Sequence, residues 1–243
     1  MKEELINITK KKSRDTREGM HEVLCVSVGN GVDLTVYRDK DNLFFVDFEK
    51  EGRTVVSPVD FVRDSNPLRA IEIRDGKLFY YPEYWCISVP IEKLRKPRNI
   101  FGLLHELGHL QIWSFWEKRG LEDLDVLMDY KVIPSKLSNE EVLRGAELEL
   151  QNERDAWAAG LRMAKKLRDV YGIDLFKLFK NNDELMGWLR VDLLETYEAE
   201  LQTHGGTPKN EKQGQVSSWL QTRWEEELAK SLKKEIDPSS DLT

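Results

Sequence analysis

The chain has 243 residues, of which 40% are apolar and 33% are charged, and its net charge is −7. This composition is typical of one large globular domain, with or without an appendage, and the acidic balance argues against a broad nucleic-acid-binding surface. No run of residues is apolar enough for a membrane span or a signal peptide, so we expect a cytoplasmic protein that binds neither membranes nor nucleic acid directly.

The N-terminal part of the chain predicts a sheet. Residues 1–20 are charged and weakly periodic, and we interpret them as an arm. After this arm, apolar and polar residues alternate in short runs bounded by turn-forming residues, which predicts an antiparallel meander with one packed face. The dipeptide Asp75-Gly76 predicts a further hairpin, in which the runs on either side of it pair with each other. The predicted strands cover residues 23–28, 32–37, 43–48, 53–56, 70–74, 77–81 and 85–89.

Two long helices are expected after the sheet. The first begins close to Pro97 and ends at Gly120. The second begins at Ser138, which forms a capping-box pattern with Glu141, and it runs to about residue 168. Within it, Gly145 and Gly160 mark either weak points or close approaches to the first helix.

The remaining chain is also expected to be helical. Asp183 can cap a helix rich in leucine and tryptophan. Residues 204–243 are interpreted as an exposed linker followed by an amphipathic helix. The domain that carries the chemistry is therefore expected to cover residues 21–203.

The segment His105-Glu106-Leu107-Gly108-His109 lies within the first long helix. Residues four apart share a helix face, so both imidazoles can bind one Zn²⁺, and Glu106 beside them can act as general base on water at that ion. The alternative is a chance pair of histidines on a half-buried helix, satisfied by their neighbours. The motif therefore predicts a zinc site for hydrolysis.

A third ligand is expected from the second long helix, because a catalytic zinc commonly has two histidines and a carboxylate. Glu153 is one candidate there. Glu147, Glu149 and Asp155 lie on the same helix, and spacing alone does not choose among the four.

The two segments His105-Glu106-Leu107-Gly108-His109 and Glu153-Arg154-Asp155-Ala156-Trp157-Ala158-Ala159 together resemble the ImmA/IrrE family of zinc peptidases, which are gluzincins. The resemblance implies an α+β zincin-like fold, with Glu153 as third zinc ligand and Asp155 as the residue that orients a ligand histidine. Trp157 stands where the family usually has Phe. After Ala159 the chain departs from the family's pattern.

The expected function is zinc-dependent endopeptidase activity on a peptide or protein substrate, which by the resemblance would be a regulatory protein such as a repressor. An extended substrate would pair with a sheet-edge strand within residues 78–89. His204, Tyr171 and Tyr197 are weaker candidates for stabilising the transition state. The alternative function is a catalytically silent binding or regulatory module that keeps the fold.

Overall fold

The structure is a computed structural model, and part of the chain is described. The expected arm, apart from residues 19 and 20, and the expected linker and helix of residues 204–243 lie outside the described residues. The described residues are 19–63, 71–76, 79–81, 85–119, 125–127, 129, 136–181, 183–185 and 187–189.

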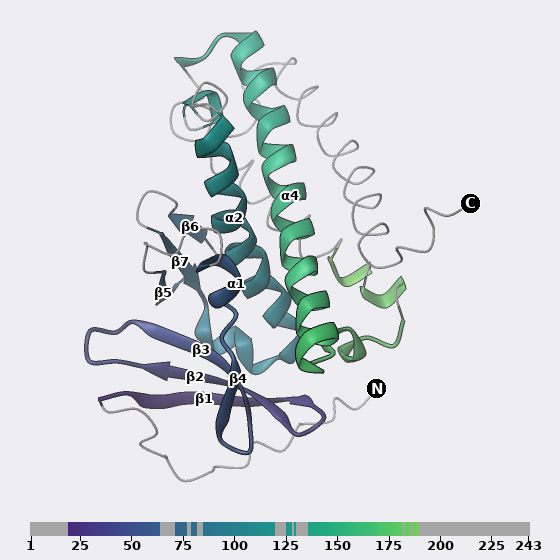
Figure 1. Cartoon of the computed structure of the whole chain (residues 1–243). Coiled ribbons are helices and arrows are strands. Elements are labelled where there is room, and N and C mark those ends of the chain that lie inside the picture. The colour runs from purple at the N-terminus through teal and green to yellow at the C-terminus, as the bar shows by residue number, and fades with distance from the viewer. Residues whose placement is uncertain are drawn as a thin grey trace.

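The described chain is an α+β fold, in which a mostly antiparallel sheet precedes the long helices, as predicted. Figure 1 shows strands β1 to β4 at one end of the described chain, strands β5 to β7 beside helix α2, and two long helices that extend away from β1–β4. The strands are β1 (His21–Gly29), β2 (Val32–Arg38), β3 (Phe44–Lys50), β4 (Arg53–Val56), β5 (Glu72–Asp75), β6 (Phe79–Tyr81) and β7 (Cys86–Val89). The helices are α1 (Asp60–Arg63), η2 (Ile91–Arg95), η3 (Pro97–Asn99), α2 (Ile100–Arg119), α4 (Asn139–Tyr171) and η5 (Leu175–Leu178).

Strands β1 to β4 form the predicted antiparallel meander. The turn between β1 and β2 has positive φ angles at Asn30 (56°) and Gly31 (71°), and the turn between β3 and β4 has them at Glu51 (53°) and Gly52 (75°). Two consecutive left-handed residues are the backbone that a two-residue hairpin needs, which is why asparagine and glycine were informative there.

The meander is buried on more than the one face that was expected. Leu34 and Val36 belong to the hydrophobic core, but Thr35 and Tyr37, which alternate with them along β2, are each 1% exposed. The Tyr37 hydroxyl donates a hydrogen bond of 2.7 Å to Glu49, and the Thr35 hydroxyl donates one of 3.1 Å to the same carboxylate. Part of the second face is therefore a polar layer in which the two side chains of β2 are buried and the Glu49 carboxylate is half-buried, and hydrogen bonding offsets the loss of hydration.

The predicted hairpin at Asp75-Gly76 is wrong, because β7 lies between the two strands expected to pair. Strand β5 pairs with β7 in parallel, and β6 pairs with the other side of β7 in antiparallel orientation. The backbone N–H of Gly76 donates to the carbonyl of Val89, and the Asp75 carboxylate accepts from the N–H of Ile91. Both residues are thus held by the end of β7. A Cβ at Gly76 would lie 2.3 Å from the Ser88 hydroxyl.

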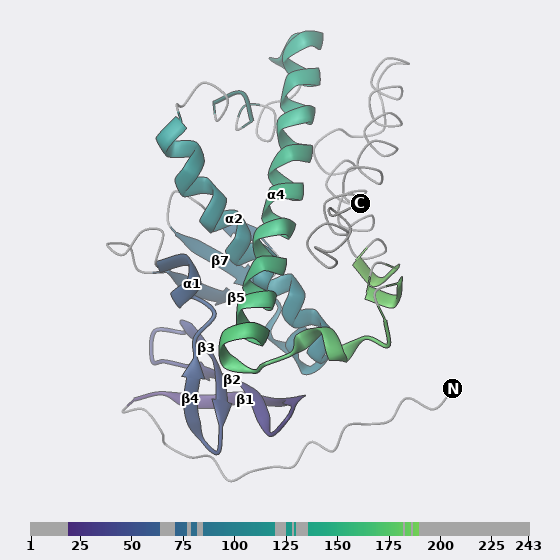
Figure 2. The ribbon, with the colours of Figure 1, turned by 45° about the vertical axis from the view of Figure 1, so that its right-hand side comes forward.

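Helix α2 is buried along its first half because it has neighbours on both sides. Residues 100–110 are all buried, and they lie between the sheet and α4. Helix α4 begins at the predicted capping box of Ser138 and Glu141 and ends at Gly172, whose φ of 70° closes its last turn. In Figures 1 and 2 the two helices run side by side. None of the described helices combines the length and the hydropathy that a membrane span requires.

The chain after α4 departs from the prediction at one cap. Asn181, rather than Asp183, accepts a side-chain hydrogen bond of 2.9 Å from the N–H of Glu184, so the capping residue lies two positions earlier than expected. Arg98 binds this segment to the start of α2 by an ion pair of 2.9 Å with Glu184 and a hydrogen bond to the carbonyl of Leu178.

Candidate metal centre

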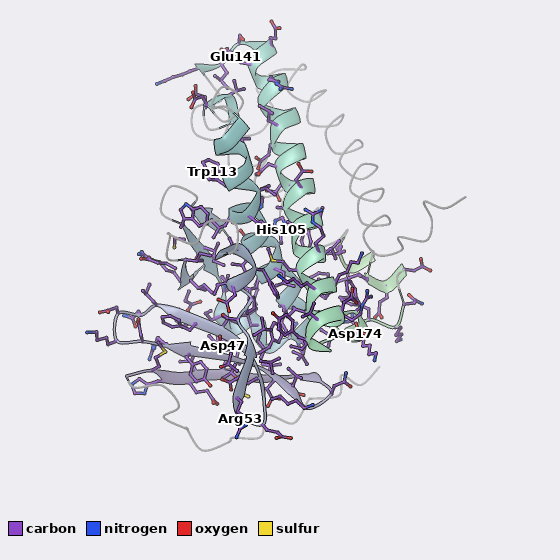
Figure 3. All side chains as sticks on the ribbon, in the orientation of Figure 1. Asp47, Arg53, His105, Trp113, Glu141 and Asp174 are labelled. Carbon is purple, nitrogen blue, oxygen red and sulfur yellow. The ribbon has the colours of Figure 1, made fainter. Side chains whose placement is uncertain are left out.

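His105 and His109 of α2 meet Glu153 of α4 in the described part of the chain. Nε2 of His105 lies 3.1 Å from one Glu153 carboxylate oxygen, and Nε2 of His109 lies 3.3 Å from the other. The two Nε2 atoms are 3.0 Å apart. All three side chains are buried. In Figure 3 His105 is labelled between the two long helices.

These separations fit a cation bound by all three side chains. Ligand atoms at about 2.0–2.1 Å from a tetrahedral zinc lie roughly 3.3–3.4 Å from one another. Hydrogen bonds alone fit less well: if both imidazoles donate to Glu153, their two N–H groups face each other at 3.0 Å. Deprotonated Nε2 atoms and a carboxylate are the donor set that Zn²⁺ takes in catalytic sites, and the fourth position stays open.

The helices approach closely enough for this contact because glycines lie where they cross. A Cβ on Gly108 would lie 2.2 Å from the carbonyl oxygen of Ala156. A Cβ on Gly160 would lie 2.9 Å from the carbonyl oxygen of Leu104 and 3.1 Å from the backbone nitrogen of His105. The interpretation of Gly160 as a close approach is therefore confirmed. Leu104 on α2 lies against Gly160 on α4, and Gly108 lies against Ala156, so residue numbers rise along one helix as they fall along the other and the helices are antiparallel.

The charged and polar groups around Glu153 keep its side chain in the ionised form. Burial raises the pKa of its carboxyl, but the charges and hydrogen bonds of His109 and His105 outweigh burial and hold this pKa well below its ordinary value. The side chain is therefore a carboxylate at neutral pH, which is the form that a metal requires.

Glu106, the residue expected to act as general base, is buried. It follows His105 directly on α2 and is 5% exposed. It is not in the group of described residues that could hold a metal ion, and its expected role as general base stays a prediction.

The other carboxylates considered for the third ligand have different positions. Glu149 is buried one turn before Glu153 but is not in the cluster that the described His and carboxylate groups form. The side chain of Glu147 lies outside the described residues. Asp155 is half-buried, and its expected role as the residue that orients a ligand histidine stays a prediction.

The candidates for transition-state stabilisation gain no support. Tyr171 ends α4 about 27 Å along the helix axis from Glu153, at 1.5 Å per residue, and its ring packs against Phe61 instead. That candidate is not supported because Tyr171 ends the helix, whereas Glu153 lies near its middle. Tyr197 and His204 lie outside the described residues.

Sequence reasoning missed the position of Trp157 in the site. Its ring stacks on the imidazole of His105, with centroids 4.4 Å apart and planes inclined by 24°. The spacing of four residues from Glu153 could have indicated it, because residues four apart share a helix face.

Comparisons of this chain with protein-family models, with curated proteins and with solved structures find no match.

Proposed function

We propose that this protein is a zinc-dependent endopeptidase with a zincin-like arrangement. The observation that carries the proposal is the convergence of His105, His109 and Glu153 within hydrogen-bond distance of one another, with Glu106 buried directly after His105 on α2. The resemblance of the two sequence segments to the ImmA/IrrE family supports the same function. Zinc is proposed over other divalent ions because two imidazoles and one carboxylate in a tetrahedral spacing suit it best.

When bound, the zinc ion would polarise the peptide carbonyl and lower the pKa of water. Glu106 would accept the proton of the attacking water as its oxygen bonds to the carbonyl carbon, and would then donate that proton to the amine nitrogen as the C–N bond breaks. The proton taken from water thus ends on the amine, and the Glu106 carboxylate is regenerated. His105, His109 and Glu153 would hold the ion, while Glu106 would be the residue that moves protons.

The substrate would bind as an extended peptide. The region predicted to hold the edge strand, residues 78–89, contains β6 and β7. Strand β7 lies inside the described sheet, whereas β6 ends its order β1-β2-β3-β5-β7-β6, so β6 is the proposed binding strand. A peptide paired with β6 through backbone hydrogen bonds would lie beside α2, which contacts β6. A regulatory protein is the proposed natural substrate, by the resemblance alone.

Metal analysis and cleavage together test this function. Purified protein is expected to carry about one zinc ion per chain, and His105→Ala or His109→Ala should lose it. The zinc-loaded protein should cleave casein or an extended peptide library, and a chelator should stop cleavage. Full zinc occupancy in both histidine variants would overturn the site. Zinc binding without any cleavage would instead support the silent binding module.

A further inference from the structure

One ring nitrogen of His105 is unusual for a metal ligand. Its Nδ1 atom is buried and has no hydrogen-bond partner among the residues that the structure describes. Histidines that bind metals almost always donate this second N–H to a carboxylate, carbonyl or water, which fixes the plane of the ring. The orientation of His105 must therefore come from another contact.

Trp157 makes that contact through the face of the ring. The indole is 2% exposed, and its plane is inclined by only 24° to the imidazole at a centroid separation of 4.4 Å. His109 packs against His105 edge-on, at 4.5 Å and 75°. Rotation about the Cβ–Cγ bond of His105 would turn the imidazole out of its plane and into the indole. The stack therefore restricts the direction in which Nε2 points.

Helix α4 contacts His105 at three positions along one face. Glu153 lies against Nε2, Trp157 covers the ring, and Gly160 lies so close that a Cβ added to it would be 3.1 Å from the backbone nitrogen. Positions separated by four and then three residues fall on the same helix stripe. One helix therefore supplies the third ligand and also holds the first ligand in place.

We propose that Trp157 is a positioning residue, which orients His105 for the metal by stacking in place of a hydrogen bond at Nδ1. This inference rests on the proposed metal site. It predicts that the face-to-face stack is needed, whereas the indole N–H is not, since Nε1 of Trp157 has no hydrogen-bond partner in the described part of the chain. Phenylalanine should then replace tryptophan, while leucine, which is apolar but has no aromatic face, should not.

Zinc affinity measured by competition with a chromogenic chelator tests the proposal. Trp157→Leu should weaken zinc by about 10–100-fold, the loss expected when the group that orients a ligand histidine is removed. Trp157→Phe should bind nearly as tightly as the unaltered protein. The matched control is Trp85→Leu, because Trp85 is equally buried but lies in the core before β7. This control should lower stability and leave the affinity unchanged.

A second measurement uses the metal-free protein, so it remains informative if zinc does not bind. The chain has four histidines, and their ring protons can be followed by NMR. The His105 signals should show the ring-current shift of a stacked indole and should move in Trp157→Leu but not in Trp85→Leu. Unaltered protein that binds no zinc would overturn the proposed function. Zinc binding that is equally tight in Trp157→Leu, or His105 signals unmoved by that change, would overturn the positioning role alone.

Discussion

The β1–β3 meander and the α2–α4 crossing each hold a glutamate, half-buried in the meander and buried in the crossing, and its polar atoms are satisfied in different ways. In the meander, Glu49 accepts hydrogen bonds from the hydroxyls of Thr35 and Tyr37, which serve there as hydrogen-bond donors. In the crossing, Glu153 faces two imidazole nitrogens, which can also bind a metal. The Glu49 carboxylate already has its hydrogen-bond donors. The Glu153 carboxylate and the two imidazoles form a group that a bound cation would complete.

The two regions also differ in how they are assembled. Each strand of the meander pairs with the next along the chain, so short turns set its register. The crossing joins helices that the residue 120–138 connection separates, and its spacing depends on backbone contacts at Gly108 and Gly160. We therefore expect changes at the crossing to alter chemistry, and changes in the meander to alter stability only.

The largest effect is expected from Glu106→Gln. The amide has nearly the same shape but cannot accept a proton from water, so cleavage should fall by about 100- to 10,000-fold, the usual range for a general base. Zinc content and the thermal unfolding midpoint should stay as in the unaltered protein. Cleavage assays with metal analysis on the same sample measure both. Activity within a few-fold of the original would mean that another group accepts the proton.

The next effect concerns the choice between two buried glutamates of α4. Glu153→Ala should weaken zinc by more than about 100-fold, since loss of a ligand should exceed the loss of a group that only orients one. Glu149→Ala is the matched control, because Glu149 is as deeply buried one turn away. Its zinc affinity should change little. A larger loss at Glu149 than at Glu153 would move the ligand by one helical turn and would also remove the resemblance to the peptidase family.

Much of this contrast could be predicted from local sequence. The capping box of α4 and the left-handed turns of the meander depend on residues close together in the chain, and both were predicted. The two histidines four residues apart indicated their common face for the same reason. Such features need no knowledge of distant contacts.

The failures involve contacts between distant segments. The Asp75-Gly76 pair is a strong hairpin signal, but insertion of β7 beside β5 overrides it. Spacing on α4 could not separate Glu149 from Glu153, because the helix presents both toward the interior and only the crossing decides which one meets the histidines. The stacking of Trp157 on His105 depends on the same crossing.

Glycine substitutions test whether the crossing sets the metal geometry. Gly108→Ala and Gly160→Ala should each lower the free energy of unfolding by about 1–3 kcal/mol, because the added methyl group meets backbone that cannot move aside. Both should also weaken zinc. Gly187→Ala is the control: a Cβ there meets nothing within 4 Å, and alanine favours helix. Urea unfolding and chelator competition measure the two quantities. Unchanged zinc affinity in both variants would show that the glycines serve packing alone.

The smallest effect is expected from Tyr37→Phe in the meander. The change removes a 2.7 Å hydrogen bond to Glu49 but keeps the buried ring, and Thr35 still donates to that carboxylate. The free energy of unfolding should therefore fall by about 1–2 kcal/mol, near the lower end for a hydrogen bond to a charged group. Because the polar layer touches neither ligand helix through this bond, zinc affinity and cleavage rate should be unchanged while urea unfolding shifts. A loss of zinc affinity as large as that of Gly108→Ala would show that the sheet and the crossing are coupled, and would remove the division between a structural carboxylate and a chemical one.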